Sequence, residues 1–246
     1  MANFLFMDES KGTETGIVAL TGILVPLDRY NDLRMRFYEL MLWAIEPAEQ
    51  TVKIGPLELH GNSFLSWHEG ADDDLKLRLL ADVASLVVDE RVAVYRVGYH
   101  RQKRLNTVLA GDVGYLSLCW NGMLTVLQPV YAAEHLIPVM DGLDLRAAQM
   151  FSQTVRTSDV MRAVGLEGSL SFGNTENILG EVFYSDSRYS IFTQVADIVS
   201  YLRHIGDKHA KGIVLSDFQQ QLSDISELLK PMMAFEEIIL MKVRNG

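Results

Sequence analysis

Four carboxylates lie in stretches of sequence whose other residues are mostly apolar. Asp8 ends the run FLFM, Glu58 lies in PLELHG, Asp141 ends LIPVM, and Asp197 lies within IFTQVADIVSYL. An ionised carboxylate is costly to bury alone, so such groups are paired, hydrogen-bonded or bound to a metal ion. A cluster of them would repel itself unless cations neutralised it, and Mg²⁺ and Mn²⁺ prefer oxygen ligands. The chemistry that this pattern predicts is cleavage of phosphodiester bonds by one or two ions that activate water.

Each carboxylate taken alone also has a simpler explanation. Asp8 and Asp141 could each begin a turn after a strand, and Glu58 could be an exposed residue of an edge strand. Asp197 is the hardest to explain in this way, because it belongs to a narrow polar stripe on an apolar helix. A stripe of this kind usually faces a cavity or a polar network. Its members follow one another at steps of 4, 3 and 4 residues: Ser190, Gln194, Asp197 and Tyr201.

The adjacent acids Asp8 and Glu9 are expected to point in different directions. Successive side chains of a strand lie on opposite faces of the sheet. If the strand persists through this pair, Asp8 shares a face with Phe6 and Glu9 points away. We therefore favour Asp8 as the site residue and expect Ser10 and Lys11 to belong to the turn that follows.

The order of apolar runs predicts the elements that must position these acids. A hairpin of strands at residues 3–7 and 17–25 comes first, and helices then alternate with strands. This order predicts a mixed α/β sheet that opens with an antiparallel hairpin and has helices on both faces, in one domain spanning residues 1–246. The further helices are expected at residues 27–45, 74–88, 112–127, 145–164, 191–204 and 217–229. The further strands are expected at 92–99, 136–141, 169–172 and 181–184.

Composition restricts the function classes. The formal net charge of −10 argues against broad attraction to a polyanion, although a local basic groove remains compatible with it. Cys119 is the only cysteine, lies in an apolar helix and is expected to pack in the core. No apolar stretch approaches the roughly 18–20 residues of a membrane span, so we expect a soluble cytoplasmic protein that does not bind membranes. Nothing in the sequence indicates an oligomeric state.

Two basic runs, RVGYHRQKRL and YLRHIGDKHAK, could contact a phosphate backbone. The first contains Arg96 and the residues that we favour for nucleic-acid binding: Arg101, Lys103 and Arg104. The second contains Arg203, His204 and Lys208. The alternative for both runs is a solvated surface at a strand end and at a helix C-terminus, where cations are favoured anyway.

Three motifs in order resemble a large bacterial family. They are FMDES, ELH and QVADIVSY, and they span residues 8 to 201. The family is a domain-of-unknown-function family, numbered thirty-eight hundred, that is grouped with the ribonuclease-H-like (retroviral-integrase-like) nucleases. The resemblance implies a ribonuclease-H-like fold in which Asp8, Glu58, Asp141 and Asp197 form an acidic metal site, with His60 and Gln194 nearby. The sequence departs from the family pattern after DES, where Lys11 replaces the usual glycine and Gly12 follows.

We therefore expect a Mg²⁺- or Mn²⁺-dependent phosphodiester hydrolase, most simply a nuclease. Asp8 would bridge the ions, Glu58 and Asp197 would complete their coordination, and Asp141 would coordinate or orient water. Lys11 and the segment 101–104 would position the substrate. His60 could be a ligand or a proton shuttle, or a core histidine. The alternatives are a non-catalytic module of the same fold that binds nucleic acid or a protein partner, and a phosphohydrolase acting on a small nucleotide.

Overall fold

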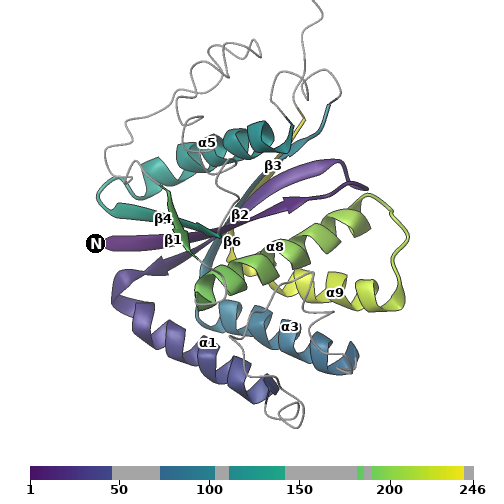
Figure 1. Cartoon of the computed structure of the whole chain (residues 1–246), viewed down its shortest axis with the longest axis horizontal. Coiled ribbons are helices and arrows are strands. Elements are labelled where there is room, and N and C mark those ends of the chain that lie inside the picture. Colours follow the sequence, from purple (N-terminus) through teal and green to yellow (C-terminus); the bar gives the residue numbers. More distant parts are fainter. Residues whose placement is uncertain (46–72, 103–110, 142–181, 186–189, 241–246) are drawn as a thin grey trace, which may run out of the picture.

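The protein is built around one mixed sheet, shown in Figure 1. The computed structural model describes residues 1–45, 73–102, 111–141, 182–185 and 190–240. The described strands form a six-stranded sheet with the order β5-β4-β1-β2-β3-β6. Their bounds are β1 Ala2–Lys11, β2 Ile17–Pro26, β3 Ala93–His100, β4 His135–Asp141, β5 Phe183–Ser185 and β6 Met233–Ile239.

The sheet opens with an antiparallel meander and continues with parallel strands on both sides. β2 is antiparallel to β1 and to β3, whereas β4 is parallel to β1, β5 to β4 and β6 to β3. In this register Asp8 lies opposite Thr21 of β2, and Met7 pairs with Met140 of β4. The carboxyl ends of β1 and β4 therefore lie side by side at one edge of the sheet.

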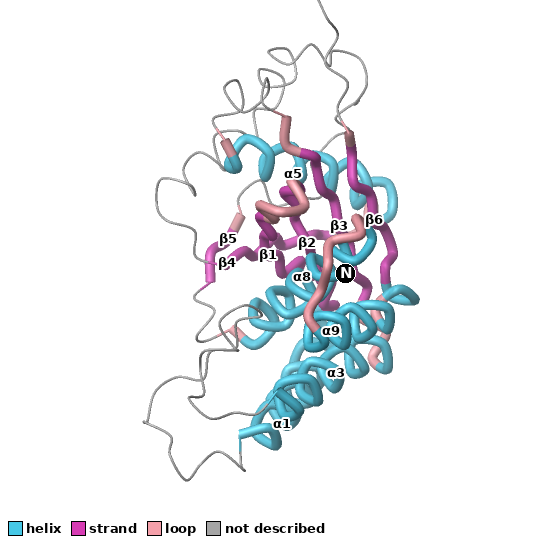
Figure 2. The backbone as a smooth tube through the Cα atoms, turned by 90° about the vertical axis from the view of Figure 1, so that its right-hand side faces the viewer, coloured by secondary structure: helices cyan, strands magenta, loops and turns pink. Residues whose placement is uncertain are grey.

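Helices cover both faces of the sheet, as Figures 1 and 2 show. Helix α5 packs on one face, and the helices of the other face form a layer in which α8 lies closest to β1 and β2. The bounds are α1 Tyr30–Ile45, α3 Asp73–Asp89, α5 Asp112–Val130, α8 Ile191–Ala210 and α9 Asp217–Leu228. The short 3₁₀ turns are η1 Leu27–Arg29 and η4 Lys230–Met232.

Alternation along β1 divides the core into two parts. Phe6 packs in the cluster on the α8 side, where its ring lies 5.1 Å from that of Phe192. Leu5 and Met7 belong to the cluster under α5, which also contains the buried Cys119. Because side chains alternate between faces, Asp8 continues the Phe6 row toward α8. Both faces of the strand are covered, which is why its apolar run is continuous.

The hairpin, the alternation of helices and strands, and the presence of helices on both faces are confirmed. Three details of the prediction were wrong. Ser10 and Lys11 continue β1 rather than entering a turn, and residues 27–29 form a 3₁₀ turn before α1. Helix α8 continues to Ala210 instead of ending at residue 204. The elements expected at 145–164 and 169–172 lie outside the described residues.

Strand β6 was not predicted from the sequence. Its residues, MAFEEII, include two adjacent acids and follow an amphipathic helix directly, so the pattern lacks a strand signal of its own. The strand forms because it pairs with β3 at the sheet edge, where Glu236 lies beside Arg96 in the register. A tertiary ion pair thus compensates for a weak local preference.

The helices in the described part of the chain are either too short or too polar to cross a membrane.

Candidate functional site

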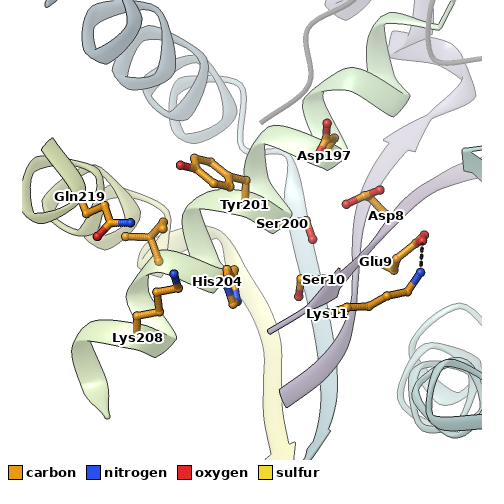
Figure 3. Close-up of a pocket in the computed structure, with 11 residues that line it drawn as sticks. Asp8, Glu9, Ser10, Lys11, Asp197, Ser200, Tyr201, His204, Lys208 and Gln219 are labelled. Atoms are coloured by element: carbon orange, nitrogen blue, oxygen red, sulfur yellow. Dashed lines mark hydrogen bonds and ion pairs between the residues drawn. The ribbon is translucent and has the colours of Figure 1, made fainter. Parts of the chain in front are cut away.

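A pocket of about 280 Å³ lies where the end of β1 meets α8 and α9. Figure 3 shows the side chains that surround it. Its walls combine acids, hydroxyls and bases, with one large apolar side chain. The lining residues are Asp8, Glu9, Ser10, Lys11, Asp197, Ser200, Tyr201, His204, Ile205, Lys208 and Gln219.

Asp8 is a strongly perturbed acid of this pocket. Burial is the main reason that its pKa is raised well above the ordinary value, and the negative charges of Asp197 and Glu9 add to the rise. Asp141 adds a smaller contribution, and the Ser200 hydroxyl opposes the shift. The apolar strand that precedes Asp8 is the cause, because it carries the carboxyl into the space under α8.

Asp197 and Asp141 reach the same region from two other elements. Asp197 lies on α8, and Figure 3 places its carboxyl at the same end of the pocket as that of Asp8. Asp141 ends β4, one residue beyond the last β1–β4 pair, and Val139 before it packs in the α8-side core. Alternation therefore places Asp141 on the same face as Asp8. Three of the four predicted carboxylates thus lie near one another.

Glu9 and Lys11 belong to the opposite face of β1, as the alternation predicted for Glu9. The Lys11 ammonium donates to the Glu9 carboxylate over 2.8 Å, and both side chains reach the rim of the pocket. The Lys11 side chain remains 41% exposed. It can therefore leave this pair at little cost when a stronger anion approaches.

Two buried hydroxyls line the pocket between β1 and α8. Ser10 follows Asp8 on the same face of β1, and Ser200 lies one turn after Asp197 on α8. Within the described part of the chain, the Ser10 hydroxyl oxygen has no hydrogen-bond partner, whereas the Ser200 hydroxyl interacts with the Asp8 carboxyl and lowers its pKa. An unsatisfied buried hydroxyl costs about 1–3 kcal/mol, so Ser10 at this pocket needs an explanation.

His204 and Lys208 form the basic end of the pocket. Burial is the main cause that lowers the pKa of His204, and the positive charge of Lys208 acts in the same direction. The nearby Asp207 opposes this shift. The Lys208 ammonium pairs with the exposed carboxylate of Glu14 over 2.6 Å. The imidazole is therefore mainly neutral near pH 7 and can donate or accept a hydrogen bond.

The glycine that follows Lys11 lies close to α8. Gly12 follows the end of β1, and a Cβ atom at this position would lie 2.5 Å from Cε1 of His204 and would also clash with Thr15. The hairpin loop therefore approaches α8 closely at Gly12, where a larger residue would require the side chains of Thr15 and His204 to move. Lys11 in turn is the last residue of β1, at the pocket rim.

The remaining predicted site residues lie elsewhere or outside the described residues. Gln194 is buried on α8, one turn before Asp197, and does not line the pocket. Arg101 donates to both carboxylate oxygens of Asp112 and to the carbonyl oxygen of Gly12, so its role in binding nucleic acid stays a prediction. Four further predicted residues lie outside the described part of the chain: Glu58, His60, Lys103 and Arg104.

Two arginines of the basic runs are not available to a phosphate backbone. Arg96 is fully buried and binds Asp207 and Glu236, and Arg203 is buried and binds Glu236. The expectation that these two could contact phosphates was wrong, because sequence proximity to other cations says nothing about which side of the strand or helix a residue occupies. They join elements of the core instead.

The polar stripe of α8 is longer than the sequence analysis predicted. It continues at steps of 3 and 4 from Tyr201 to His204 and Lys208, and both of these line the pocket. This continuation was readable, since the same spacing carried the first half of the stripe. The prediction placed Ser10 in a turn, so it did not identify Ser10 as a residue of the pocket.

Among the described side chains alone, no group of three or more histidines, cysteines, aspartates or glutamates is arranged to hold a metal ion. The donor chemistry nevertheless fits a divalent cation. The acids that act on Asp8 carry oxygen ligands, and a cation there would relieve the repulsion that raises its pKa. Glu58, the predicted third ligand, lies outside the described residues.

Comparison of the sequence with models of protein families gives no match, and no curated protein is significantly similar to the chain.

Proposed function

We propose that the protein is a divalent-metal-dependent hydrolase of phosphodiester bonds, with Mg²⁺ or Mn²⁺ at Asp8. The observation that carries this proposal is the raised pKa of Asp8, caused by burial and by Asp197, Glu9 and Asp141. A carboxylate held in such surroundings costs stability unless a cation or a proton neutralises it. Strong perturbation of an acid inside a pocket is typical of functional sites.

The sheet supports the ribonuclease-H-like part of the proposal. The resemblance implies five strands in a mixed sheet that opens with antiparallel strands and is flanked by helices. Strands β1 to β5 agree with this description, and β6 extends the sheet beyond β3. Asp8 on β1, Asp141 on β4 and Asp197 on α8 occupy the elements that the motifs assign to the acidic site.

Asp8 and Asp197 are the residues that would hold the ion, together with Glu58, while Asp141 would orient water. The ion would supply charge neutralisation at the phosphate and a more acidic water molecule.

Cleavage of labelled single- and double-stranded DNA and RNA in Mn²⁺ and in Mg²⁺ tests this function. We expect cleavage by the wild-type protein that chelation abolishes, and a loss of more than about 100-fold in Asp8→Asn, since even indirect support of a metal commonly contributes 10–100-fold. The matched control is Asp224→Asn, which changes an exposed acid on α9 and should keep full activity.

Metal binding is measured separately by thermal unfolding. Mn²⁺ should raise the unfolding midpoint of the wild-type protein and of Asp224→Asn but not that of Asp8→Asn, because a ligand that binds only the folded state stabilises it. Cleavage that survives Asp8→Asn would disprove the site. A metal-dependent midpoint without cleavage of any of these substrates would instead favour a non-catalytic module.

A further inference from the structure

The two ends of the pocket differ in their chemistry. Asp8 and Asp197 lie at one end, where Lys11 pairs with Glu9, and His204 and Lys208 lie toward the other, as Figure 3 shows. A metal ion at the acidic end accounts for only half of this arrangement. The basic end has the chemistry of an anion site.

A buried hydroxyl supports a ligand in the same pocket. The exposed fraction of Ser10 is 9%, yet its hydroxyl oxygen has no hydrogen-bond partner among the described residues. Ser10 lines the pocket together with His204. Native proteins rarely leave such a group unsatisfied, so a ligand with acceptor oxygens is the natural partner.

The Lys208 side chain at this end can release its present partner, Glu14. The Lys208 side chain is 16% exposed, whereas Glu14, to which it binds, is 60% exposed at its side chain. Ion pairs with such an exposed partner contribute little to stability. An incoming phosphate could therefore take the place of Glu14 without a large penalty, and a terminal phosphate would carry more negative charge than one carboxylate.

The basic end is too far from the acidic end to bind the same phosphate. Asp197 and His204 are separated by seven residues of α8, or about 10 Å along the helix axis. A phosphate whose metal ion is held by Asp8 and Asp197 would therefore occupy a different part of the pocket from an anion held at His204. The anion held at His204 must be a different one.

We propose that His204, Lys208 and Ser10 form a subsite for a second phosphate group of the substrate, separate from the phosphate that is cleaved. This inference rests on the proposed function, because the second phosphate is defined relative to the cleaved one. Lys208 supplies charge, and the imidazole and the Ser10 hydroxyl supply hydrogen-bond donors. The substrate class is thereby a phosphodiester that carries at least one further phosphate.

Binding of inorganic phosphate to the full chain in EDTA tests the subsite without any catalysis. Isothermal titration calorimetry gives the affinity, and the NMR signal of the His204 imidazole reports the location. We expect saturable binding that shifts this signal. Absence of binding, or binding that leaves the His204 signal unchanged, would overturn the proposal.

Variants assign the binding to these residues. Lys208→Met and His204→Gln should each weaken phosphate binding at least about tenfold, and Ser10→Ala, which removes only one oxygen atom, about threefold or more. The matched control is Lys230→Met, since Lys230 is exposed and pairs with Glu227 outside the pocket. Circular dichroism checks the fold of each variant. Equal affinity in the folded Lys208→Met and Lys230→Met proteins would overturn the assignment.

The source of the phosphate is distinguished by kinetics in Mn²⁺. A dinucleotide with a single phosphodiester, the same dinucleotide with a terminal phosphate, and a longer strand are compared. A lower KM for the second substrate, lost in Lys208→Met at unchanged kcat, supports a terminal phosphate. A lower KM for the longer strand alone supports the neighbouring phosphate of a nucleic acid. Equal KM values for all three would contradict the subsite.

Asp8→Asn separates this proposal from the proposed function. This variant lacks the candidate metal ligand but keeps the basic end of the pocket, so it should bind phosphate in EDTA at least as well as the wild-type protein. If the protein binds phosphate but hydrolyses no substrate, the subsite stands and the proposed hydrolase function is disproved. If the protein hydrolyses substrate but does not bind phosphate at His204, the function stands and the subsite is disproved.

Discussion

Asp8 shows how a single acid depends on the strand that carries it. The four apolar residues before it are packed on both faces of β1, so the strand continues in register and brings the carboxyl under α8. Burial and the neighbouring acids then raise its pKa. The folded chain keeps this residue at the expense of stability, as is common where function requires a perturbed group.

The raised pKa has a consequence for stability in the absence of metal. A carboxyl whose pKa is higher in the folded state binds its proton more tightly there, so its contribution to stability falls as the pH rises from about 3.8. Asp8→Asn removes this loss, and we expect the variant to unfold at higher denaturant concentration at pH 7.5 in EDTA. The advantage should shrink as the pH is lowered toward 4.

Denaturant unfolding at pH 7.5, 6 and 5 measures this effect. Asp224→Asn is the control, because an exposed substitution should change the free energy of unfolding by less than about 0.5 kcal/mol at each pH. An Asp8→Asn protein that is less stable than the wild type at pH 7.5 without metal would contradict the burial of this charge.

At the scale of elements, the pocket depends on how the β1–β2 hairpin meets α8. The loop closes through a hydrogen bond from the Gly12 amide to the Ile17 carbonyl oxygen, at 2.9 Å. Gly16 adopts a positive φ of 64° within this loop. The loop then lies against His204, at the position where Gly12 has no side chain. The contact between the β1–β2 loop and His204 thus fixes the hairpin against α8 and also positions one wall of the pocket.

Gly12→Ala should separate the hairpin from α8. The added methyl group would meet His204 and Thr15, and overpacking of this kind commonly costs about 1–3 kcal/mol. We expect a lower free energy of unfolding and a changed NMR signal of the His204 imidazole.

Gly16→Ala is the matched control for this hairpin variant. Nothing lies within 4 Å of the position of its Cβ, so the cost should be only the backbone strain of about 1 kcal/mol. Its His204 signal should resemble that of the wild type. If Gly12→Ala left both stability and the His204 signal unchanged, the close approach of the loop would be disproved.

At the scale of the molecule, one buried cation joins elements that lie far apart in the chain. The guanidinium of Arg96 on β3 donates to Asp207 of α8 over 2.5 Å and to Glu236 of β6 over 3.0 Å. Arg203 binds the same Glu236 over 2.7 Å. The burial of Arg96 is complete, so its charge is balanced by these acids alone among the described residues. This network holds the β6 edge and α8 against the sheet.

Arg96→Met should destabilise the whole fold by about 3–5 kcal/mol, because it removes one partner of a buried ion pair and leaves Asp207 without it. Arg36→Met is the matched control: Arg36 is 59% exposed at its side chain, and its partner Glu90 keeps Arg29. The control should lose no more than about 1 kcal/mol. Equal losses in the two variants, measured by urea unfolding, would show that the Arg96 network is not structural.

Local patterns were enough for the elements that carry the site. The apolar runs predicted β1, β2, β3 and β4, and the spacing of apolar residues predicted the helices. The polar stripe on α8 and the alternation of Asp8 and Glu9 were also readable, because they depend on the regular periods of a helix and a strand. Those periods predict the direction in which each side chain points, and this is sufficient to assign each acid to one face of its strand or helix.

The tertiary structure decided the properties that depend on contacts between residues of different elements. Arg96 and His204 both stand in basic runs, yet one lies in a buried ion-pair network and the other lines a pocket. β6 exists because β3 and Arg96 pair with it, and Gly12 is favoured because His204 approaches it. The sequence by itself determined which faces are apolar and where the acids stand on each element. Only the packing of β1, β4 and α8 determined that Asp8, Asp141 and Asp197 share one charged environment, because pairing between distant segments depends on complementary surfaces that no local period contains.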